Sequence, residues 1–187
     1  MLLCDMVFLI FSILLCAYII IDFILNIKNE WQEKIIFRWS QPLAIALLVV
    51  IVISTVSERY IAKRDINYVI SLVGIILFLT AFLLRIWSKK SLGQYYSSHI
   101  QVKNNHRIVE NGPYKIMRHP YYFSIIIGAL SFPLIVNAYF SFCLALITIV
   151  PLIVIRCYIE EAMLLQRFGN QYRKYMEKTK LFSNREN

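Results

Sequence analysis

The sequence predicts an all-α, polytopic membrane protein with about five transmembrane helices and a C-terminal interfacial helix. Of its 187 residues, 59% are hydrophobic and 17% are charged, whereas an ordinary soluble domain is about 45–50% apolar and about 25% charged. The apolar residues fall into long runs, and 20 Lys and Arg residues, against 11 Asp and Glu, stand mainly between those runs. The excess apolar surface has to face lipid, which excludes a soluble enzyme, a disordered chain and a secreted disulfide scaffold.

Five apolar segments come close to the roughly 20 residues that a helix needs to cross a hydrocarbon core about 30 Å thick. They cover about residues 6–27, 39–56, 68–87, 121–136 and 138–155. Asn137 separates the last two, so we expect a tight helical hairpin there. The amino terminus carries Asp5 and no Lys or Arg before the first run, which differs from a cleaved signal peptide and favours a true span.

The positions of the basic residues predict how the spans are oriented. If five spans alternate across the bilayer, 17 of the 20 Lys and Arg residues fall on one side. The positive-inside rule places that side in the cytoplasm. The connection 88–120 and the C-terminal tail are then expected to meet at the cytoplasmic face. Residues 1–187 form one integral-membrane domain with no room for a separate soluble unit, so any chemistry belongs to the cytoplasmic ends of the helices.

Residue spacing excludes several common ligand sites. The two closest of the five glycines, Gly112 and Gly128, are 16 residues apart, which fits neither a dinucleotide-binding glycine turn nor a phosphate-binding loop. The three histidines, His99, His106 and His119, lack the spacing of a metal site, so we expect no metal. The net charge of +9 is compatible with a protein that binds nucleic acid, but the long uncharged apolar runs argue against that class. The four cysteines form no C-x-x-C pair and are interpreted as small buried hydrophobic residues.

Residues 106–122 form an unusual connection. The Gly-Pro pair at 112–113 predicts a sharp turn, and Pro120 suits the first turn of the next helix because its missing N–H would be unpaired there. Arg118 and His119 would then stand at the amino-terminal end of a membrane helix, which favours an anionic or polar ligand group. The alternative is a basic and aromatic belt at the membrane surface, in which Arg118 reaches lipid headgroups.

A second candidate site follows the fifth apolar run. Arg156 and Glu160 share one helical face, and Glu161 lies about 100° further round. Two adjacent carboxylates at a membrane boundary are costly unless a cation pairs with one of them. The alternative is a structural ion pair between Arg156 and Glu160. Pro151 is expected to kink this helix or to open its hydrogen bonding.

The chain from about residue 160 to 178 has the pattern of an amphipathic helix, with aromatic and apolar residues recurring between basic ones. We expect it to lie on the inner leaflet, and Gly169 should weaken or divide it. Asp22 lies inside the first apolar run, where a hydrogen bond at the membrane interface is sufficient to explain it.

Four groups of motif residues follow one another along the second half of the chain. They are Arg85-x-Trp87-Ser88 with Leu92-Gly93-x-x-Tyr96-Ser97, then His106-x-Ile108-Val109-x-x-Gly112-Pro113-Tyr114-x-x-x-Arg118-His119-Pro120-x-Tyr122, then Arg156-x-x-x-Glu160-Glu161, and finally Phe168-Gly169-x-x-Tyr172-x-x-Tyr175. This order resembles the isoprenylcysteine carboxyl methyltransferase family. The Gly-Pro-Tyr, Arg-His-Pro and Glu-Glu signatures are the specific part of this resemblance.

The resemblance implies an integral-membrane methyltransferase that uses S-adenosylmethionine without a Rossmann domain, in agreement with the glycine spacing. At matching motif positions, Arg156 and Glu160 are the implied catalytic residues, and Arg156 is the one that holds the substrate carboxylate. Gln101 matches a family glutamine at a slightly different spacing. The implied cofactor contacts are Gln101, His106, Arg107, Ile108, Val109, Tyr114, His119, Pro120, Tyr121, Tyr122 and Glu160.

The implied reaction is methyl transfer to a lipidic acceptor, with the carboxylate of a prenylated cysteine or a similar compound as the leading candidate. Ser124 and Ile125 stand where the family often has glycine and an aromatic residue, so the acceptor tunnel is expected to differ in shape. The alternatives are another acceptor (a phospholipid amine, a lipidic phenol or a thiol), a non-catalytic lipid-binding membrane protein, and a membrane reductase similar to certain sterol reductases. The expected partners are a lipidic or prenylated substrate and membrane lipid.

Overall fold

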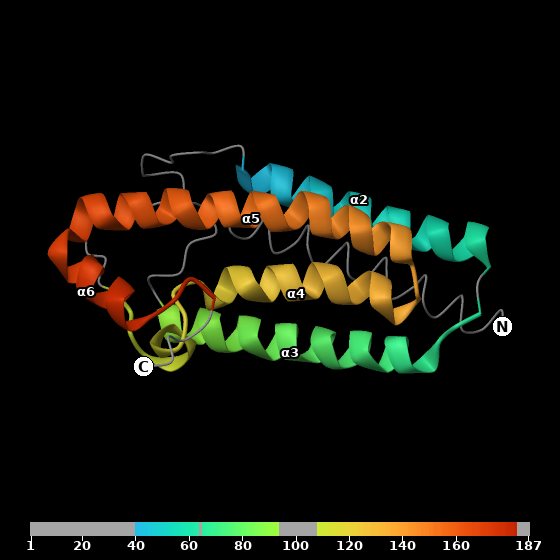
Figure 1. The fold of residues 1–187 in the computed structure, drawn as a ribbon, viewed down its shortest axis with the longest axis horizontal. Coiled ribbons are helices and arrows are strands. Elements are labelled where there is room, and N and C mark those ends of the chain that lie inside the picture. The colour runs from blue at the N-terminus through green and yellow to red at the C-terminus, as the bar shows by residue number, and fades with distance from the viewer. Residues whose placement is uncertain (1–39, 64, 94–107, 183–187) are drawn as a thin grey trace.

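The computed structural model describes residues 40–63, 65–93 and 108–182, and its long helices run along a common direction (Figure 1). Within these ranges the sole β-type pairing is an isolated bridge between Met117 and Lys180. The predicted all-α class is confirmed, and the predicted first span lies outside the described residues. The helices are α2 (Ser40–Ala62), α3 (Tyr68–Leu92), η2 (Gly112–Lys115), α4 (Pro120–Ile135), α5 (Tyr139–Phe168) and α6 (Asn170–Lys178).

Three of the described helices, α2, α3 and α5, are long and apolar enough to cross a membrane. They contain 23, 25 and 30 residues, and at about 1.5 Å per residue each exceeds a hydrocarbon core of about 30 Å. Helix α4 is equally apolar but has 16 residues, or about 24 Å. The protein is therefore an integral membrane protein, while the total of five spans stays a prediction.

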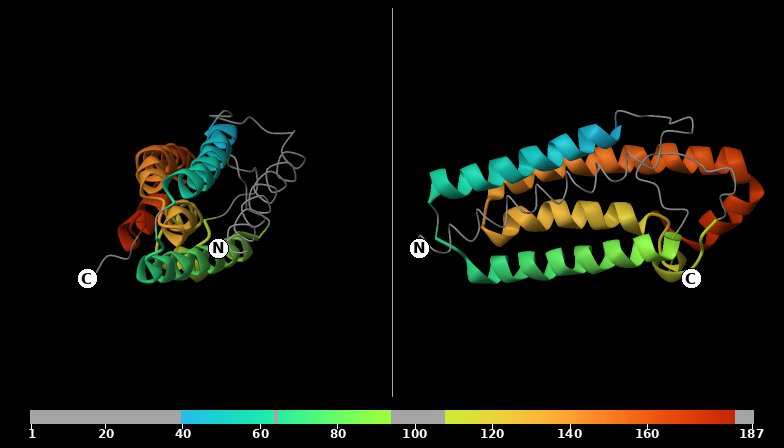
Figure 2. Two further views of the ribbon diagram at one scale, coloured as in Figure 1. Left: turned by 90° about the vertical axis from the view of Figure 1, so that its right-hand side faces the viewer. Right: turned by 180° about the vertical axis from the view of Figure 1, so that it is seen from behind.

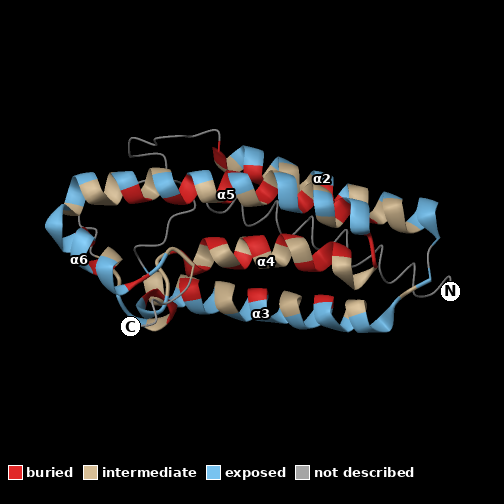
Figure 3. Cartoon of the chain, in the orientation of Figure 1, coloured by how far each residue is buried: buried red, intermediate tan, exposed pale blue. Residues whose placement is uncertain are grey.

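The helices differ in how far they are buried: α4 lies at the centre and α3 at the periphery. Helix α4 packs against α2, α3 and α5, and its surface is largely covered (Figure 3). The core joins Ile51 of α2 to Ile126 of α4 and to Ile149 and Ile153 of α5. Helix α3 instead exposes a row of large apolar side chains, which are stable facing lipid but not water. These include Leu72, Ile76, Leu79, Leu83 and Ile86.

The predicted hairpin between the last two spans is confirmed, with α4 ending at Ile135 and α5 beginning at Tyr139. Asn137 makes the turn with φ of 58°, a left-handed conformation that asparagine tolerates better than most residues. Its side chain accepts a hydrogen bond from the Asn67 N–H at 2.8 Å and donates to Ser71 Oγ at 2.9 Å. The turn is thereby tied to the first residues of α3.

The last two helices are separated at Gly169, as predicted. Gly169 has φ of 51°, and its N–H caps α5 by donating to Leu165 O at 2.9 Å. Helix α6 then folds back beside the end of the bundle (Figure 2). Tyr172 and Tyr175 of α6 are 2% and 4% exposed because protein covers them. The position of α6 on the inner leaflet stays a prediction. Helix α5 itself continues through Pro151.

Candidate functional site

The described segments with motif residues meet at one end of the bundle, where α3 and α5 finish and α4 begins (Figure 1). The predicted turn is the short helix η2, which starts at Gly112 with φ of 58°. A Cβ atom on Gly112 would collide with the Ser91 side chain and lie 3.1 Å from Trp87 Nε1. Only glycine therefore allows the turn to pack this closely on the last turns of α3.

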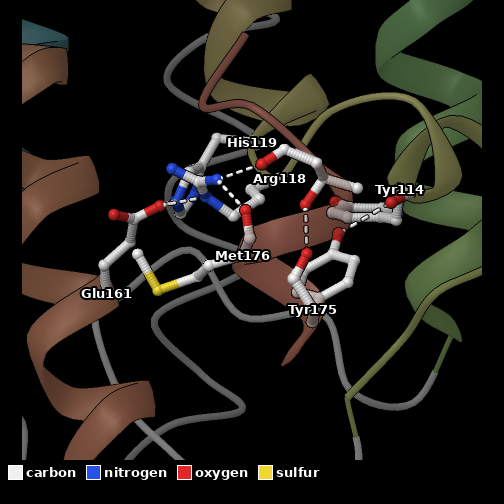
Figure 4. A network of polar contacts seen from close by, with 7 residues as sticks. Tyr114, Arg118, His119, Glu161, Tyr175 and Met176 are labelled. Atoms are coloured by element: carbon white, nitrogen blue, oxygen red, sulfur yellow. Dashed lines mark hydrogen bonds and ion pairs between the residues drawn. The ribbon is translucent and has the colours of Figure 1, made fainter. Parts of the chain in front are cut away.

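Arg118 and Glu161 form the centre of a buried polar cluster (Figure 4). Arg118 Nε lies 2.5 Å from Glu161 Oε1, and the two side chains are 11% and 7% exposed. Arg118 also donates to the main-chain carbonyls of Met176 and Thr179. Neither the expected ligand-binding role of Arg118 nor its alternative contact with headgroups agrees with this geometry, because its guanidinium is used inside the protein.

The ionisation of Glu161 depends on the same contacts. The apolar run of α5 ends at residue 155, so this carboxylate lies in the last turns of the helix, beyond the span. Burial alone would raise the pKa of Glu161, but hydrogen bonds and charge from His119 and Arg118 outweigh burial and lower it. Glu161 Oε1 lies 3.3 Å from His119 Nε2. A carboxylate held in this way stays ionised and fixes the imidazole beside it.

Residues 179–182, here called the tail strap, hold the main chain immediately before α4. Arg118 N–H donates to Lys180 O at 2.9 Å, and His119 N–H donates to Leu181 O at 3.2 Å. Phe182 stacks on Phe123 with ring centroids 5.6 Å apart. Two main-chain donors that precede the helix are thereby satisfied by a segment about 60 residues away in the sequence.

The start of η2 is held by α6. Tyr175 Oη donates to Tyr114 O at 2.7 Å (Figure 4), and both rings are buried. Burial raises the pKa of both tyrosines, to which Glu160 adds for Tyr114 and Glu110 for Tyr175. The two phenols therefore stay neutral and act as packing and hydrogen-bonding groups.

Arg156 is the centre of a second cluster, which joins three helices. It is 1% exposed, donates from Nη1 to Ser40 Oγ at 2.7 Å, and lies with Cζ 5.5 Å from the centre of the Tyr122 ring. The Tyr122 side chain lies close to both Arg156 and Glu160. The arginine and the glutamate that were expected to act together thus share a partner from α4.

His119 connects the two clusters. Its ring stacks on Tyr122 with centroids 5.7 Å apart, while its Nε2 faces Glu161. Tyr122 in turn contacts Tyr121, with ring centroids 5.9 Å apart. The chain of contacts runs from the tail strap through His119 to Arg156, so the position of the second cluster depends on the first.

A cavity of about 390 Å³ opens beside Arg156, between α2, α3, α4 and α5. Most of its described lining is apolar. Its charged members are Arg85 and Arg156, and the described lining contains no Asp or Glu. The polar members and the two tyrosines come from the helix ends near Arg156, whereas most apolar members lie further along the bundle. These apolar residues include Ile51, Phe78, Ala81, Phe82, Ala129 and Phe132.

The structure groups the predicted site residues in three ways. Tyr121, Tyr122, Arg156 and Glu160 come together beside the cavity. His119 lies in the adjacent cluster with Pro120, and Tyr114 packs on α6, while Ile108 and Val109 lie partly buried in the chain before η2. The remaining predicted cofactor contacts, Gln101, His106 and Arg107, lie outside the described residues.

Nothing in the sequence indicated one residue of this site, Ser40, and two motif residues, Glu161 and Arg85, were not assigned a role. Ser40 holds Arg156, but no local pattern marks it. Glu161 pairs with Arg118, and the signal was its place in the Glu-Glu pair, of which one member was taken for the site. Arg85 lines the cavity, and its signal was a basic residue inside an apolar run.

Comparison with known proteins agrees with this geometry. The model of the isoprenylcysteine carboxyl methyltransferase (ICMT) family matches residues 73–166, which run from α3 to the last turns of α5 and include both clusters except for Ser40 and the tail. The chain is also similar to the protein described as "Uncharacterized protein YpbQ" of Bacillus subtilis (strain 168). The two are 31% identical over 119 residues, which cover 63% of this chain and 70% of the relative. The chain belongs to the isoprenylcysteine carboxyl methyltransferase family, and it is a membrane methyltransferase.

Proposed function

We propose that this protein transfers a methyl group from S-adenosylmethionine to an anionic oxygen of a single-chain lipidic acceptor. The leading acceptor is the carboxylate of a prenylated cysteine or a similar lipidic acid. The observation that carries the proposal is the cavity of about 390 Å³, with an apolar lining and two arginines as its charged members in the described part of the chain. Such a lining suits a hydrocarbon tail with a negatively charged head.

The residues beside the cavity fit S-adenosylmethionine, which carries two cationic groups and a carboxylate. Glu160 lies close to Tyr122, and the faces of Tyr121 and Tyr122 offer negative potential to a cation. When bound, the sulfonium supplies an electrophilic methyl group: the acceptor oxygen provides the electron pair of the new O–CH₃ bond, and the electrons of the broken S–CH₃ bond stay on sulfur. Glu160 and the two tyrosines are proposed to bind and orient the donor.

Arg156 is proposed to hold the acceptor. Its planar guanidinium matches a carboxylate with two parallel hydrogen bonds, which fixes orientation better than a lysine would. Ser40 and Tyr122 already restrict its side chain, so little conformational freedom is lost on binding. An ionised carboxylate needs no general base; the protein contributes alignment and the exclusion of water.

The cavity disfavours a phospholipid amine as acceptor. Two arginines in its lining would repel a cationic headgroup. A volume of about 390 Å³ is also near the lower end of the roughly 300–1,000 Å³ typical of small-molecule sites, which suits one hydrocarbon chain better than two. A lipidic phenol remains the in-class alternative, since its oxygen becomes anionic on deprotonation.

Binding of the cofactor is tested with purified protein in detergent. We expect saturable binding of S-adenosylmethionine that is lost in Glu160→Ala. Glu177→Ala, which removes a carboxylate from the exposed side of α6, is the matched control and should bind as the wild type does. Absence of binding in the wild type would overturn the proposal.

The acceptor is tested by mass spectrometry of lipid extracts incubated with a labelled methyl donor. Arg156→Ala should abolish methylation of an N-acetylated S-prenylcysteine and leave cofactor binding intact, whereas the control Arg173→Ala, at an exposed position of α6, should retain activity. Methylation of a lipidic phenol with no methylation of the acid would assign the alternative acceptor.

We propose that the site faces the cytoplasm. The proposal rests on the excess of Lys and Arg on one side of the predicted spans and on the contacts between the tail and the chain before α4. A fluorescent protein fused to the C-terminus should fold and fluoresce on the cytoplasmic side, while alkaline phosphatase fused there should be inactive. The reverse pattern would contradict this orientation.

A further inference from the structure

Arg85 occupies an unusual position for a basic residue. It lies in α3, where the neighbouring side chains Leu83 and Ile86 are exposed towards lipid. The Arg85 side chain instead lines the cavity between α3 and α4. A charged group that lines a largely apolar cavity is expensive and is usually retained for a function. Arg156 of α5 lines the same cavity.

Each of the two arginines that line the cavity contacts one of two adjacent tyrosines of α4. Arg85 Nη2 lies 3.4 Å from Tyr121 Oη, and its Cζ lies 5.5 Å from the centre of the Tyr121 ring. Arg156 Cζ lies 5.5 Å from the centre of the Tyr122 ring. The two tyrosine rings contact each other with centroids 5.9 Å apart. Two guanidinium groups, one from α3 and one from α5, therefore face the same polar end of the cavity.

Like charges that line one apolar cavity repel each other, and this repulsion is relieved when an anion lies between them. An acceptor whose charge is spread over two oxygens satisfies both groups at once, since each guanidinium presents donors in a fixed plane. An acceptor with a neutral headgroup relieves less of this repulsion, and one with a cationic headgroup adds to it.

We propose that Arg85 is a second acceptor-binding residue, which contacts the anionic head of the lipidic acceptor from the α3 side and makes the enzyme selective for acids over neutral analogues. The proposal rests on the proposed function and deepens it. It assigns Arg85 to the acceptor because Arg85 lines the same largely apolar cavity as Arg156, whereas Glu160 is not among the described residues of that lining.

The competing explanation is that Arg85 has a structural role only and holds the Tyr121 ring in place. Lys89 provides the matched control, since its Nζ lies 5.9 Å from the centre of the same ring but the residue does not belong to the cavity lining. Replacing Lys89 removes one positive charge over Tyr121 and leaves the described cavity lining intact. Replacing Arg85 changes both.

The experiment measures the affinity of the purified wild type, Arg85→Ala, Arg85→Lys and Lys89→Ala for two probes. The probes are an N-acetylated S-prenylcysteine and its neutral carboxamide. We expect Arg85→Ala to weaken acid binding by about tenfold, as loss of a charge-assisted hydrogen bond predicts, with amide binding and the Kd for S-adenosylmethionine unchanged. Arg85→Lys should recover part of the acid preference, and Lys89→Ala should match the wild type.

Two results would overturn the role of Arg85. One is an equal loss of acid and amide binding in Arg85→Ala, which indicates bracing. The other is an unchanged acid preference in that variant. If Arg85→Ala fails to fold, Arg85→Lys decides, because a point charge without the planar donors should lower the acid preference by a few fold. If the wild type and the Arg85 variants all bind the cofactor and all prefer the acid, only the role of Arg85 is contradicted. If the wild type binds neither the acid nor the carboxamide, the proposed acceptor is contradicted as well.

Discussion

Arg118, in the segment before α4, and Glu161, near the end of α5, form an ion pair with Nε and Oε1 2.5 Å apart. The pair does more than join two segments, since Arg118 also holds the carbonyls of Met176 and Thr179, and Glu161 faces His119. Three segments, the connection before α4, the end of α5 and the tail, are therefore fixed by one arginine. In a membrane protein whose apolar helices gain little by packing in lipid, such polar contacts contribute much of the specificity at the helix ends.

Replacing Glu161 by alanine should destabilise the protein strongly. The change leaves the Arg118 charge buried without its carboxylate, which typically costs about 3–5 kcal/mol. We expect a lower Tm in detergent, measured by circular dichroism or by a thermal shift assay. Glu177→Ala, at an exposed site on α6, is the control. Equal Tm values for the two variants would show that the ion pair contributes little.

Stability should fall in acid, and Glu161 should account for part of the fall. Its pKa in the folded protein is lowered from the ordinary value of 4.5, so its stabilising contribution is present above pH 4.5 and is lost as the pH falls through the lower folded value. The measurement is Tm as a function of pH in the wild type and in Glu161→Gln. The variant should be less stable near neutral pH and should depend less on pH below about 4.5; parallel curves would assign the acid sensitivity to other groups.

Removal of the tail strap should weaken cofactor binding. A chain that ends after Lys178 lacks the two carbonyls that accept from Arg118 and His119, so His119 and the start of α4 lose their fixed position. We expect at least a tenfold loss of affinity for S-adenosylmethionine, in line with a misplaced binding group, while the helical circular dichroism signal persists. A chain that ends after Phe182 keeps the strap and is the control. Equal affinities in both truncated proteins would mean that the strap has no role in the site.

Gly112→Ala should destabilise the turn more than Gly93→Ala does. Both glycines have positive φ, 58° and 50°, but an added Cβ meets the Ser91 side chain at Gly112 and meets nothing within 4 Å at Gly93. Backbone strain of about 1–3 kcal/mol is common to the two variants, and the collision adds to it at Gly112. Tm and cofactor affinity check the prediction. A larger effect at Gly93 would contradict the close packing of η2 on α3.

Local features were predictable because their causes are local. Gly169 divides the tail as expected, since a residue with positive φ ends a helix wherever it stands in the chain. Pro120 begins α4 because its missing N–H is harmless in the first turn. The apolar runs fixed α2 and α3 to within a few residues, except that each helix extends further at its C-terminal end than hydropathy alone indicates.

The partners of the charged residues were not predictable in the same way. Helical spacing favoured Arg156 with Glu160 four residues away, but Arg156 donates to Ser40, 116 residues earlier. Arg118 was expected to face lipid or a ligand, and it pairs with Glu161, 43 residues later. Spacing along one helix indicates which residues share a face, but it does not tell which other helix covers that face.

The sequence by itself determined that this protein is helical and lies in a membrane, which family it belongs to, and which motif residues matter. Hydropathy, glycine and proline positions carry this information because each acts within one or two helical turns. Only the tertiary structure decided the positions of the motif residues: Arg118 and Glu161 form a buried ion pair, whereas Arg156, Tyr122 and Arg85 line the cavity. The physical reason is that a buried charge is stabilised by whichever partner the packing of distant helices brings to it, and that packing involves the whole bundle.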